Sequence, residues 1–302
     1  MRIVFMGTPD FAVPSLRRLA GDGHEIAGVY TNPDRPKNRG MKLTASPVKQ
    51  TALELGARVL QPRTLREEGV LEELRALEPE LIVVAAYGRI LPKEVLELPK
   101  YGCINVHSSL LPKYRGAAPI NWAVVNGDAE TGVTIMYMAE GLDTGDIIAQ
   151  RATAIGPEEN AEELYTRLAE LGAELLSETV ASIADGTARR TPQDDALSCY
   201  APMLSRELCP IDWNREAQAI HDQIRGLVPW PATTFELEGK TFKAYASRVL
   251  GGTEKAPGTL LGGDKEGIKF ACGDGKVIAL TEIQAPGKRR MAASDFLRGH
   301  KL

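Results

Sequence analysis

The first third of the chain alternates short apolar runs with stretches of helical periodicity. Residues 1–6 and 25–30 are apolar and rich in β-branched side chains, and residues 13–20 between them have the spacing of a helix. A strand, a helix and a second strand in this order are typical of a parallel sheet with a crossover helix. The pattern therefore predicts an α/β fold with a Rossmann-like, mostly parallel sheet.

Further apolar runs extend this predicted sheet. Residues 81–86 and 101–106 are short, apolar and bounded by turn residues, which favours buried central strands. We also expect strands at 132–138 and 147–154, and helices at 46–55, 117–126 and 158–184. The glycine spacing G-x-G-x-x-G is absent, which disfavours a nicotinamide cofactor.

The last third of the chain has a different pattern. After a short helix predicted at 215–226, short alternating segments are separated by glycine turns such as Glu238-Gly239 and Gly262-Gly263. Strands at this spacing predict a small OB-like β-barrel. The stretch 186–205 is polar and lacks periodicity, so we expect a first domain at 1–185, a linker at 186–205 and a second domain at 206–302.

Composition narrows the class of protein. The chain has 302 residues, a length typical of two domains. Its content of 43% hydrophobic and 25% charged residues is ordinary for a soluble globular protein. No run of eighteen apolar residues occurs and the first residues enter a strand directly, so we expect a cytoplasmic protein without a membrane span. The four cysteines are widely spaced and there are only four histidines, so we expect reduced thiols and no metal site.

Charge is distributed unevenly along the chain. The overall net charge is −4, whereas residues 206–302 hold 15 Lys and Arg against 12 Asp and Glu, a net charge of +3. A mildly basic second domain after an acidic first domain fits a polyanionic substrate that the second domain helps to hold. A difference of this size also arises by chance, so it carries little weight.

Candidate chemistry is concentrated after the strand predicted at 101–106. Asn105 and His107 are two residues apart and therefore share one face of that strand, at its carboxyl end, where open α/β sheets bind ligands. With Asp143 they form a complete set for acyl transfer to an amine: an N–H donor for an oxyanion, a group that moves a proton near neutral pH, and a carboxylate that orients it. Taken singly, each is more often a turn, capping or structural residue.

Two sequence blocks resemble the signature of the folate-dependent formyltransferases. These are Asn-x-His-x-Ser-Leu-Leu-Pro-x-Tyr-Arg-Gly from Asn105 and Gly-Leu-Asp-Thr-Gly-Asp around Asp143. The resemblance implies that Asn105, His107 and Asp143 are catalytic and that the formyl donor is 10-formyltetrahydrofolate. It also implies a folate site formed by Ser109, Leu110, Leu111 and Pro112, with Tyr87, Gly88, Ile90 and Leu91 as the wall for the pterin.

The resemblance extends over the whole chain to the branch of this family that formylates the methionine on initiator tRNA. It implies initiator methionyl-tRNA as the partner and a monomeric protein. The polar loop predicted at 31–44 contains Arg39 and Lys42, and Arg39 occupies the position of the branch's recognition arginine. A basic cluster, Lys288, Arg289 and Arg290, is expected to contact the tRNA backbone; on composition alone it is equally a solvated hairpin.

Other functions remain open at this point. A formyltetrahydrofolate hydrolase, or a formyltransferase for an amino sugar or a purine precursor, would carry the same three residues. A purine-precursor enzyme would not need the barrel, and the hydrolase or the sugar enzyme would not need the arginine-bearing loop. A silent RNA- or folate-binding module is disfavoured because the three residues are intact.

Overall fold

The structure is a computed structural model that describes residues 1–37, 42–300 and 302. Two compact units are distinguished in it. Unit 1 comprises Met1–Gly116, Gly132–Thr153 and Tyr165–Tyr200, and unit 2 comprises Ala117–Thr131, Ala154–Leu164 and Ala201–Leu302. Each unit therefore contains three separate segments of the chain.

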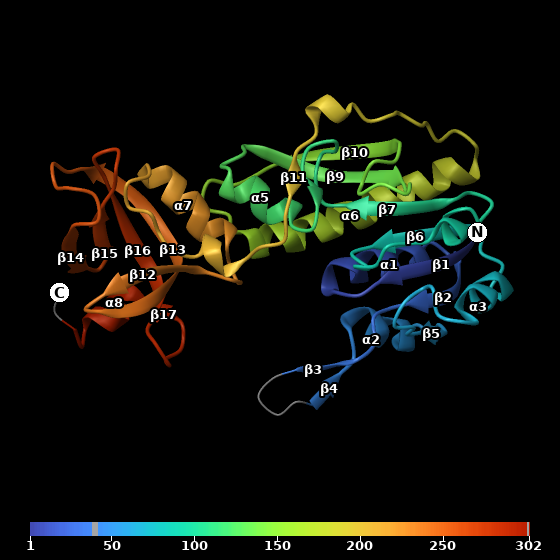
Figure 1. The fold of residues 1–302 in the computed structure, drawn as a ribbon, viewed down its shortest axis with the longest axis horizontal. Helices are drawn as coiled ribbons and strands as arrows, with labels where there is room; N and C mark the ends of the chain where they lie inside the picture. The colour runs from blue at the N-terminus through green and yellow to red at the C-terminus, as the bar shows by residue number, and fades with distance from the viewer. Residues whose placement is uncertain (38–41, 301) are drawn as a thin grey trace. The chain divides into compact units, whose positions relative to one another are not determined.

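Unit 1 is built on a seven-stranded sheet of order β10-β9-β7-β6-β1-β2-β5 (Figure 1). The pairings of β1 with β2 and β6, of β6 with β7, and of β2 with β5 are parallel, whereas β7 and β9 are antiparallel. The strands are β1 (Arg2–Gly7), β2 (Glu25–Tyr30), β5 (Val59–Leu60), β6 (Leu81–Ala85), β7 (Cys103–His107), β9 (Glu130–Tyr137) and β10 (Ile147–Ala154). All five residues of β6 are buried, as a central parallel strand requires.

Helices cover the sheet of unit 1. They are α1 (Val13–Gly21), α2 (Pro47–Glu54), α3 (Val70–Ala76), α4 (Lys93–Leu96) and most of the long α6 (Ala161–Ala184). The Ser46 side chain accepts the Lys49 amide and caps α2. In α6, Gly172 lets the helix approach the sheet, because a Cβ there would lie 2.9 Å from a methyl group of Val106 in β7.

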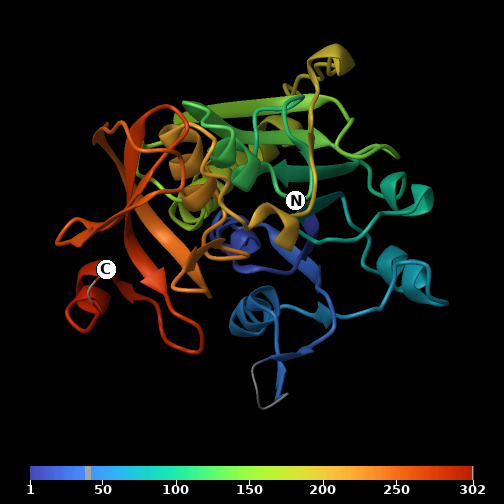
Figure 2. The same cartoon turned by 60° about the vertical axis from the view of Figure 1, so that its left-hand side comes forward.

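The segment predicted as a loop at 31–44 contains regular structure. Strands β3 (Arg35–Lys37) and β4 (Lys42–Thr44) form an antiparallel pair that extends away from the sheet of unit 1 (Figures 1 and 2). The expectation of a plain loop was therefore wrong for these residues. The first strand was not predicted because it contains Pro36, and proline in strands is confined mostly to sheet edges.

Unit 2 contains an antiparallel sheet of order β12-β13-β16-β15-β14, with β17 paired to β16. Its strands are β12 (Thr233–Leu237), β13 (Lys240–Gly252), β14 (Leu260–Asp264), β15 (Gly267–Ala271), β16 (Lys276–Gln284) and β17 (Met291–Ala292). Helices α5 (Pro119–Val125), α7 (Ala217–Gly226) and α8 (Ala293–Leu297) complete the unit. The predicted fold class, a Rossmann-like, mostly parallel sheet domain followed by a small OB-like β-barrel domain, is confirmed as a mostly parallel central sheet and a separate antiparallel sheet domain.

The core of unit 2 combines aliphatic side chains with several aromatic pairs. Trp213 stacks on Phe270 with ring centroids 4.4 Å apart, and Phe242 meets Phe296 edge to face at 5.4 Å. Such pairs add to the stability that apolar burial provides. None of the helices in the described part of the chain is long and apolar enough to cross a membrane.

Most of the polar stretch at 186–205, predicted as a linker, belongs to unit 1 and has a defined structure there. A 3₁₀ helix occupies Asp195–Leu197, and the two-residue strand β11 (Tyr200–Ala201) pairs with β8 (Arg115–Gly116). The Arg115 amide donates to the Cys199 carbonyl at 2.9 Å, and Ile147 and Thr191 exchange backbone hydrogen bonds. The boundaries 1–185, 186–205 and 206–302 stay a prediction.

Candidate active site

The site begins at the carboxyl end of β7, where Asn105 and His107 stand on the same face of the strand. Asn105 is paired with Val84 of β6 on one side and with Met136 of β9 on the other. Both neighbours belong to the buried core, so the strand that carries the two polar side chains is held in register from both sides.

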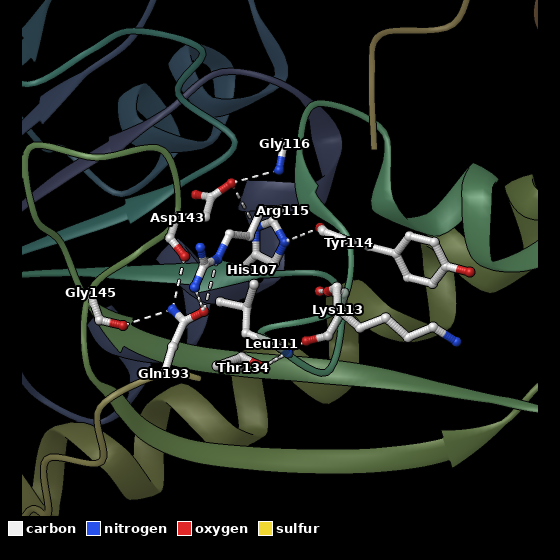
Figure 3. Close-up of polar contacts among 11 residues, drawn as sticks. His107, Leu111, Lys113, Tyr114, Arg115, Gly116, Thr134, Asp143, Gly145 and Gln193 are labelled. Atoms are coloured by element: carbon white, nitrogen blue, oxygen red, sulfur yellow. Dashed lines mark hydrogen bonds and ion pairs between the residues drawn. The ribbon is translucent and has the colours of Figure 1, made fainter. Parts of the chain in front are cut away.

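His107 is buried and its ring is oriented by the loop that follows (Figure 3). Its Nε2 lies 2.9 Å from the Tyr114 carbonyl, which can only accept, so Nε2 carries a proton and donates it. In the neutral ring Nδ1 is then the free acceptor. Nδ1 lies 3.8 Å from Oδ2 of Asp143, so a proton taken up by His107 arrives on the side of this carboxylate.

Asp143 is held in an uncommon backbone conformation. Its φ is +51°, in the left-handed region that residues with a Cβ rarely adopt. Its Oδ2 accepts the Gly116 amide at 2.8 Å, which links the Asp143 loop to the loop after β7. The carboxylate is thus fixed by a backbone donor rather than by the histidine alone.

The loop from Ser109 to Pro112 is fixed by Thr134 of β9. The Thr134 hydroxyl donates to the Ser109 carbonyl at 2.6 Å and accepts from the Leu111 amide at 3.1 Å. It also accepts from Gln150 Nε2 at 2.9 Å, and that amide donates to the Leu111 carbonyl as well. One buried hydroxyl therefore satisfies two backbone groups of a loop whose Leu111-Pro112 bond is cis.

Residues 87–91, predicted as a pterin wall, divide into two sets. Tyr87 and Leu91 are buried in the apolar core beside β6, and burial raises the pKa of Tyr87 to about 12. Gly88 and Ile90 are exposed, and the Ile90 side chain is 87% exposed, which is unusual for a large apolar residue. Of the four, only Gly88 and Ile90 offer their surface to a ligand.

The predicted RNA-contact residues lie in both units. Arg39 lies outside the described residues, and Lys42 begins strand β4. Lys288 and Arg289 are exposed on the turn before β17. Arg290 pairs with Glu282 at 2.6 Å and lies over the Tyr245 ring at 4.6 Å, and the Glu282 hydrogen bond raises the pKa of its guanidinium.

Several polar residues of the site gave no recognisable signal in the sequence. Gln193 donates through Nε2 to the carbonyls of Asp143 and Gly145, both at 2.8 Å, and its Oε1 accepts from Arg115 (Figure 3). The sequence marks Thr134 and Gln150 only as positions in the strands predicted at 132–138 and 147–154. Within residues 1–37, 42–300 and 302, no group of His, Cys, Asp and Glu is arranged to hold a metal ion.

A second polar cluster lies where β1, β2 and β6 end. Asn32 Nδ2 donates to the Thr8 hydroxyl and to the Tyr87 carbonyl, both at 3.0 Å, and its Oδ1 accepts from Arg89 Nε at 2.7 Å. Asp34 pairs with Lys49 at 2.7 Å, and this hydrogen bond lowers the pKa of the carboxyl. The cluster ties the base of the β3–β4 pair to the segment that carries Gly88 and Ile90.

Comparison with known proteins identifies the class to which this fold and site belong. The family profile described as "Formyl transferase" matches residues 1–180, and "Formyl transferase, C-terminal domain" matches residues 203–301. The methionyl-tRNA formyltransferase of Citrifermentans bemidjiense is 51% identical over 100% of this chain and 94% of its own length. That of Halalkalibacterium halodurans is 50% identical over 99% of this chain and 95% of its own length.

The fold is shared with more distant solved structures. An N-formyltransferase from Helicobacter canadensis, solved with folinic acid and dTDP-3-aminofucose, aligns with a TM-score of 0.67 at 22% identity, over 94% of this chain and 99% of the other. HypX from Aquifex aeolicus, solved with tetrahydrofolic acid, aligns with a TM-score of 0.67 at 19% identity, over 98% of this chain and 47% of the other. The profile matches and the relatives of about 50% identity show that the chain belongs to the formyl transferase family, and within it to the methionyl-tRNA formyltransferases.

Proposed function

We propose that this protein transfers the formyl group of 10-formyltetrahydrofolate to the α-amine of methionine on initiator methionyl-tRNA, for translation initiation. The observation that carries the proposal is the pairing of His107 Nδ1 with Asp143 beside Asn105, in a chain about half identical to methionyl-tRNA formyltransferases over its whole length. The proposal places the reaction in the cytoplasm and treats the protein as a monomer.

Asn105, His107 and Asp143 have distinct roles in the proposed reaction. The unprotonated α-amine attacks the formyl carbon, and the carbonyl oxygen becomes an oxyanion that the Asn105 side-chain N–H stabilises. His107 takes the amine proton at Nδ1 and returns it to N10 of the folate as the C–N bond breaks. Asp143 faces the imidazolium that exists between these two transfers. No residue of the chain becomes acylated.

Exposed apolar surface near the site supports folate as the donor. Ile90 and Leu142 are 87% and 58% exposed, although both are large apolar side chains. Binding sites for flat heterocycles combine such apolar surface with a few backbone groups, which Gly88, Leu110 and Pro112 would supply here. Ser109 and Leu111 are buried and would shape the loop from within, as Tyr87 and Leu91 would shape the wall.

For the tRNA we propose two contact regions. Arg39 and Lys42 would contact the acceptor end, and Lys288, Arg289 and Arg290 would contact the backbone. Arginine suits such contacts because its guanidinium forks to phosphate and stacks on bases. Within this scheme residues 1–185 form the catalytic domain, 186–205 the linker and 206–302 the tRNA-binding domain.

The proposal is tested by measuring formyl transfer from 10-formyltetrahydrofolate to charged initiator tRNA, beside free methionine and uncharged tRNA. We expect rapid formylation of the charged tRNA alone. In the same assay Asn105→Ala and Asn105→Asp, which both lack the N–H donor, should lower single-turnover formylation by about 10²–10³-fold. Release of formate and tetrahydrofolate without transfer would instead identify a hydrolase, and near-normal turnover by both variants would refute the oxyanion role.

A further inference from the structure

Gln193 uses its whole side-chain amide to join two parts of the candidate active site (Figure 3). Its two N–H groups donate to the Asp143 and Gly145 carbonyls, each at 2.8 Å. Its oxygen accepts from Arg115 Nε at 3.1 Å and from Arg115 Nη2 at 2.9 Å. Among residues 189–197 it is the one side chain that is not exposed.

The Asp143 loop needs support from outside its own sequence. Asp143 has a φ of +51°, and a conformation of this kind persists only where its surroundings fix it. The residues around it are permissive, because Gly141 lies two positions before Asp143 and Gly145 two positions after. Gly145 must remain glycine, since a Cβ there would lie 1.7 Å from the Tyr137 carbonyl oxygen. Gln193, fifty residues away in sequence, supplies hydrogen bonds to two carbonyls of this loop.

Gln193 also contacts Arg115, the residue next to the backbone partner of the Asp143 carboxylate. Arg115 immediately precedes Gly116, whose amide donates to Asp143 Oδ2 at 2.8 Å. Arg115 is itself fixed by Asp195 at 2.7 Å and has only 12% of its side chain exposed. The Gln193 side-chain amide thus connects the backbone of Asp143 to the loop after β7. That loop presents both the Gly116 amide and the Tyr114 carbonyl to the site.

We infer that Gln193 is a positioning residue for formyl transfer, which holds the Asp143 carboxylate beside His107 Nδ1 through the Asp143 and Gly145 carbonyls. The inference rests on the proposed function. Gln193 lies in the stretch between the two parts of the chain that the family profiles match, residues 1–180 and 203–301. The inference gives a residue of the predicted linker a part in the chemistry, besides the linker's role of joining two domains.

The decisive variant is Gln193→Glu. Glutamate keeps the acceptor for Arg115 but loses both donors and turns a carboxylate oxygen toward two carbonyls, so the loop loses its support while the Arg115 contact stays. We expect kcat for formylation to fall about 10- to 10²-fold, as for a misplacement of about 1 Å. The KM for 10-formyltetrahydrofolate should change less than twofold. Gln50→Glu, the same change at an exposed position of α2, is the control and should leave kcat within twofold.

A double-mutant cycle separates positioning from a general structural role. If Gln193 acts through Asp143, Gln193→Glu should lower single-turnover formylation less than threefold in an Asp143→Asn background. Hydrogen–deuterium exchange of the peptide covering residues 141–146 should rise in Gln193→Glu and stay unchanged in Gln50→Glu. This second readout requires no substrate.

The outcomes are distinguishable. The inference is overturned if Gln193→Glu keeps kcat and loop exchange within twofold of the parent, or if its loss of activity is undiminished in the Asp143→Asn background. A parent protein that does not formylate methionyl-tRNA would overturn the proposed function instead. The exchange of residues 141–146 would then decide by itself whether Gln193 holds the loop.

Discussion

His107 Nδ1 lies 3.8 Å from Asp143 Oδ2, whereas the same carboxylate oxygen accepts the Gly116 amide at 2.8 Å. The distance to the imidazole is longer than an N–H···O hydrogen bond, and the tautomer imposed by the Tyr114 carbonyl leaves Nδ1 without a proton. The Gly116 amide is therefore the donor that fixes this carboxylate oxygen, and the unprotonated Nδ1 faces the oxygen at a longer distance.

The first prediction concerns this pair. Asp143→Asn keeps an oxygen for the Gly116 amide but removes the negative charge that faces Nδ1. We expect formyl transfer to fall about 10²–10⁴-fold, the range of general acid–base catalysis, with tRNA binding unchanged. Single-turnover formylation and a filter-binding assay measure the two effects. Asp185→Asn, at an exposed position just after α6, is the control and should be within twofold of the parent.

The second prediction concerns the loop after β7. Thr134→Val is close to isosteric but removes the hydroxyl that serves the Ser109 carbonyl and the Leu111 amide. Leaving buried backbone groups unsatisfied costs about 1–3 kcal/mol, so the free energy of unfolding should fall by this amount. Urea denaturation measures it, and Thr134→Ser, which keeps the hydroxyl, should recover most of the loss. A Thr134→Val protein as stable as the parent would contradict the role of this hydroxyl.

A buried ion pair gives the third prediction. Arg225 and Asp222 in α7 are 2.7 Å apart with 8% and 7% of their side chains exposed, and Arg225 also donates to the Gly156 and Glu159 carbonyls. Arg225→Met leaves a buried carboxylate without its cation, so we expect a loss of about 3–5 kcal/mol in the free energy of unfolding. Arg298→Met removes an exposed pair with Asp295 and should cost less than about 1 kcal/mol. Equal losses for the two variants would show that burial of the pair has no consequence.

The fourth prediction concerns pH. Burial raises the pKa of the Cys103 thiol to about 12 from an ordinary value near 9. Between these values the folded thiol keeps its proton and the unfolded thiol loses it, so the free energy of unfolding should decrease as the pH rises. One such group contributes a slope of at most about 1.4 kcal/mol per pH unit. Denaturant unfolding at pH 9 and 10 should show a smaller slope for Cys103→Ala, whereas Cys199→Ala, which removes an exposed thiol, should keep the parent slope.

The fifth prediction addresses tRNA binding through the turn before β17. Lys288 and Arg289 are exposed, whereas Arg290 is already engaged by Glu282 and Tyr245. Lys288→Ala with Arg289→Ala should weaken binding and reduce the salt dependence of log K by about 1 for each phosphate that is no longer neutralised. A titration over several salt concentrations measures this slope. Lys240→Ala with Lys255→Ala removes the same charge elsewhere on unit 2, and an equal change in slope for both doubles would exclude a specific contact.

Elements with a strong local pattern were predicted well from the sequence. The apolar run of β6, the strand β2 (Glu25–Tyr30) and the strand β10 (Ile147–Ala154) were expected at or within one residue of their observed bounds. Burial on both faces of a sheet, or alternation on one face, leaves a direct trace in the residue types. The β3–β4 pair was missed because proline and basic residues dominate its composition.

The residues that support the site could not be predicted from a pattern in the sequence. Gln193 donates to two backbone carbonyls, and Thr134 bonds to one carbonyl and one amide. Almost every residue possesses these backbone groups, so the residue types of the two loops do not mark the contacts. The separation in sequence, fifty residues from Gln193 to Asp143 and 23 from Thr134 to Leu111, makes the contacts a product of the tertiary fold. The chemically distinctive residues Asn105, His107 and Asp143 could be found by pattern, but their support could not.

The composition of unit 2 from three chain segments limits how this protein can be recombined with its relatives. Hydrogen bonds join the three segments of unit 2. Arg225 donates to the Gly156 and Glu159 carbonyls, Asn121 donates to the Gly226 carbonyl, and Trp122 donates to the Pro202 carbonyl. A chimaera joined near residue 203 would mix one parent's β sheet with the other parent's residues 117–131 and 154–164. Such a chimaera should be stable only when the two internal segments come from the same parent as the carboxyl-terminal part.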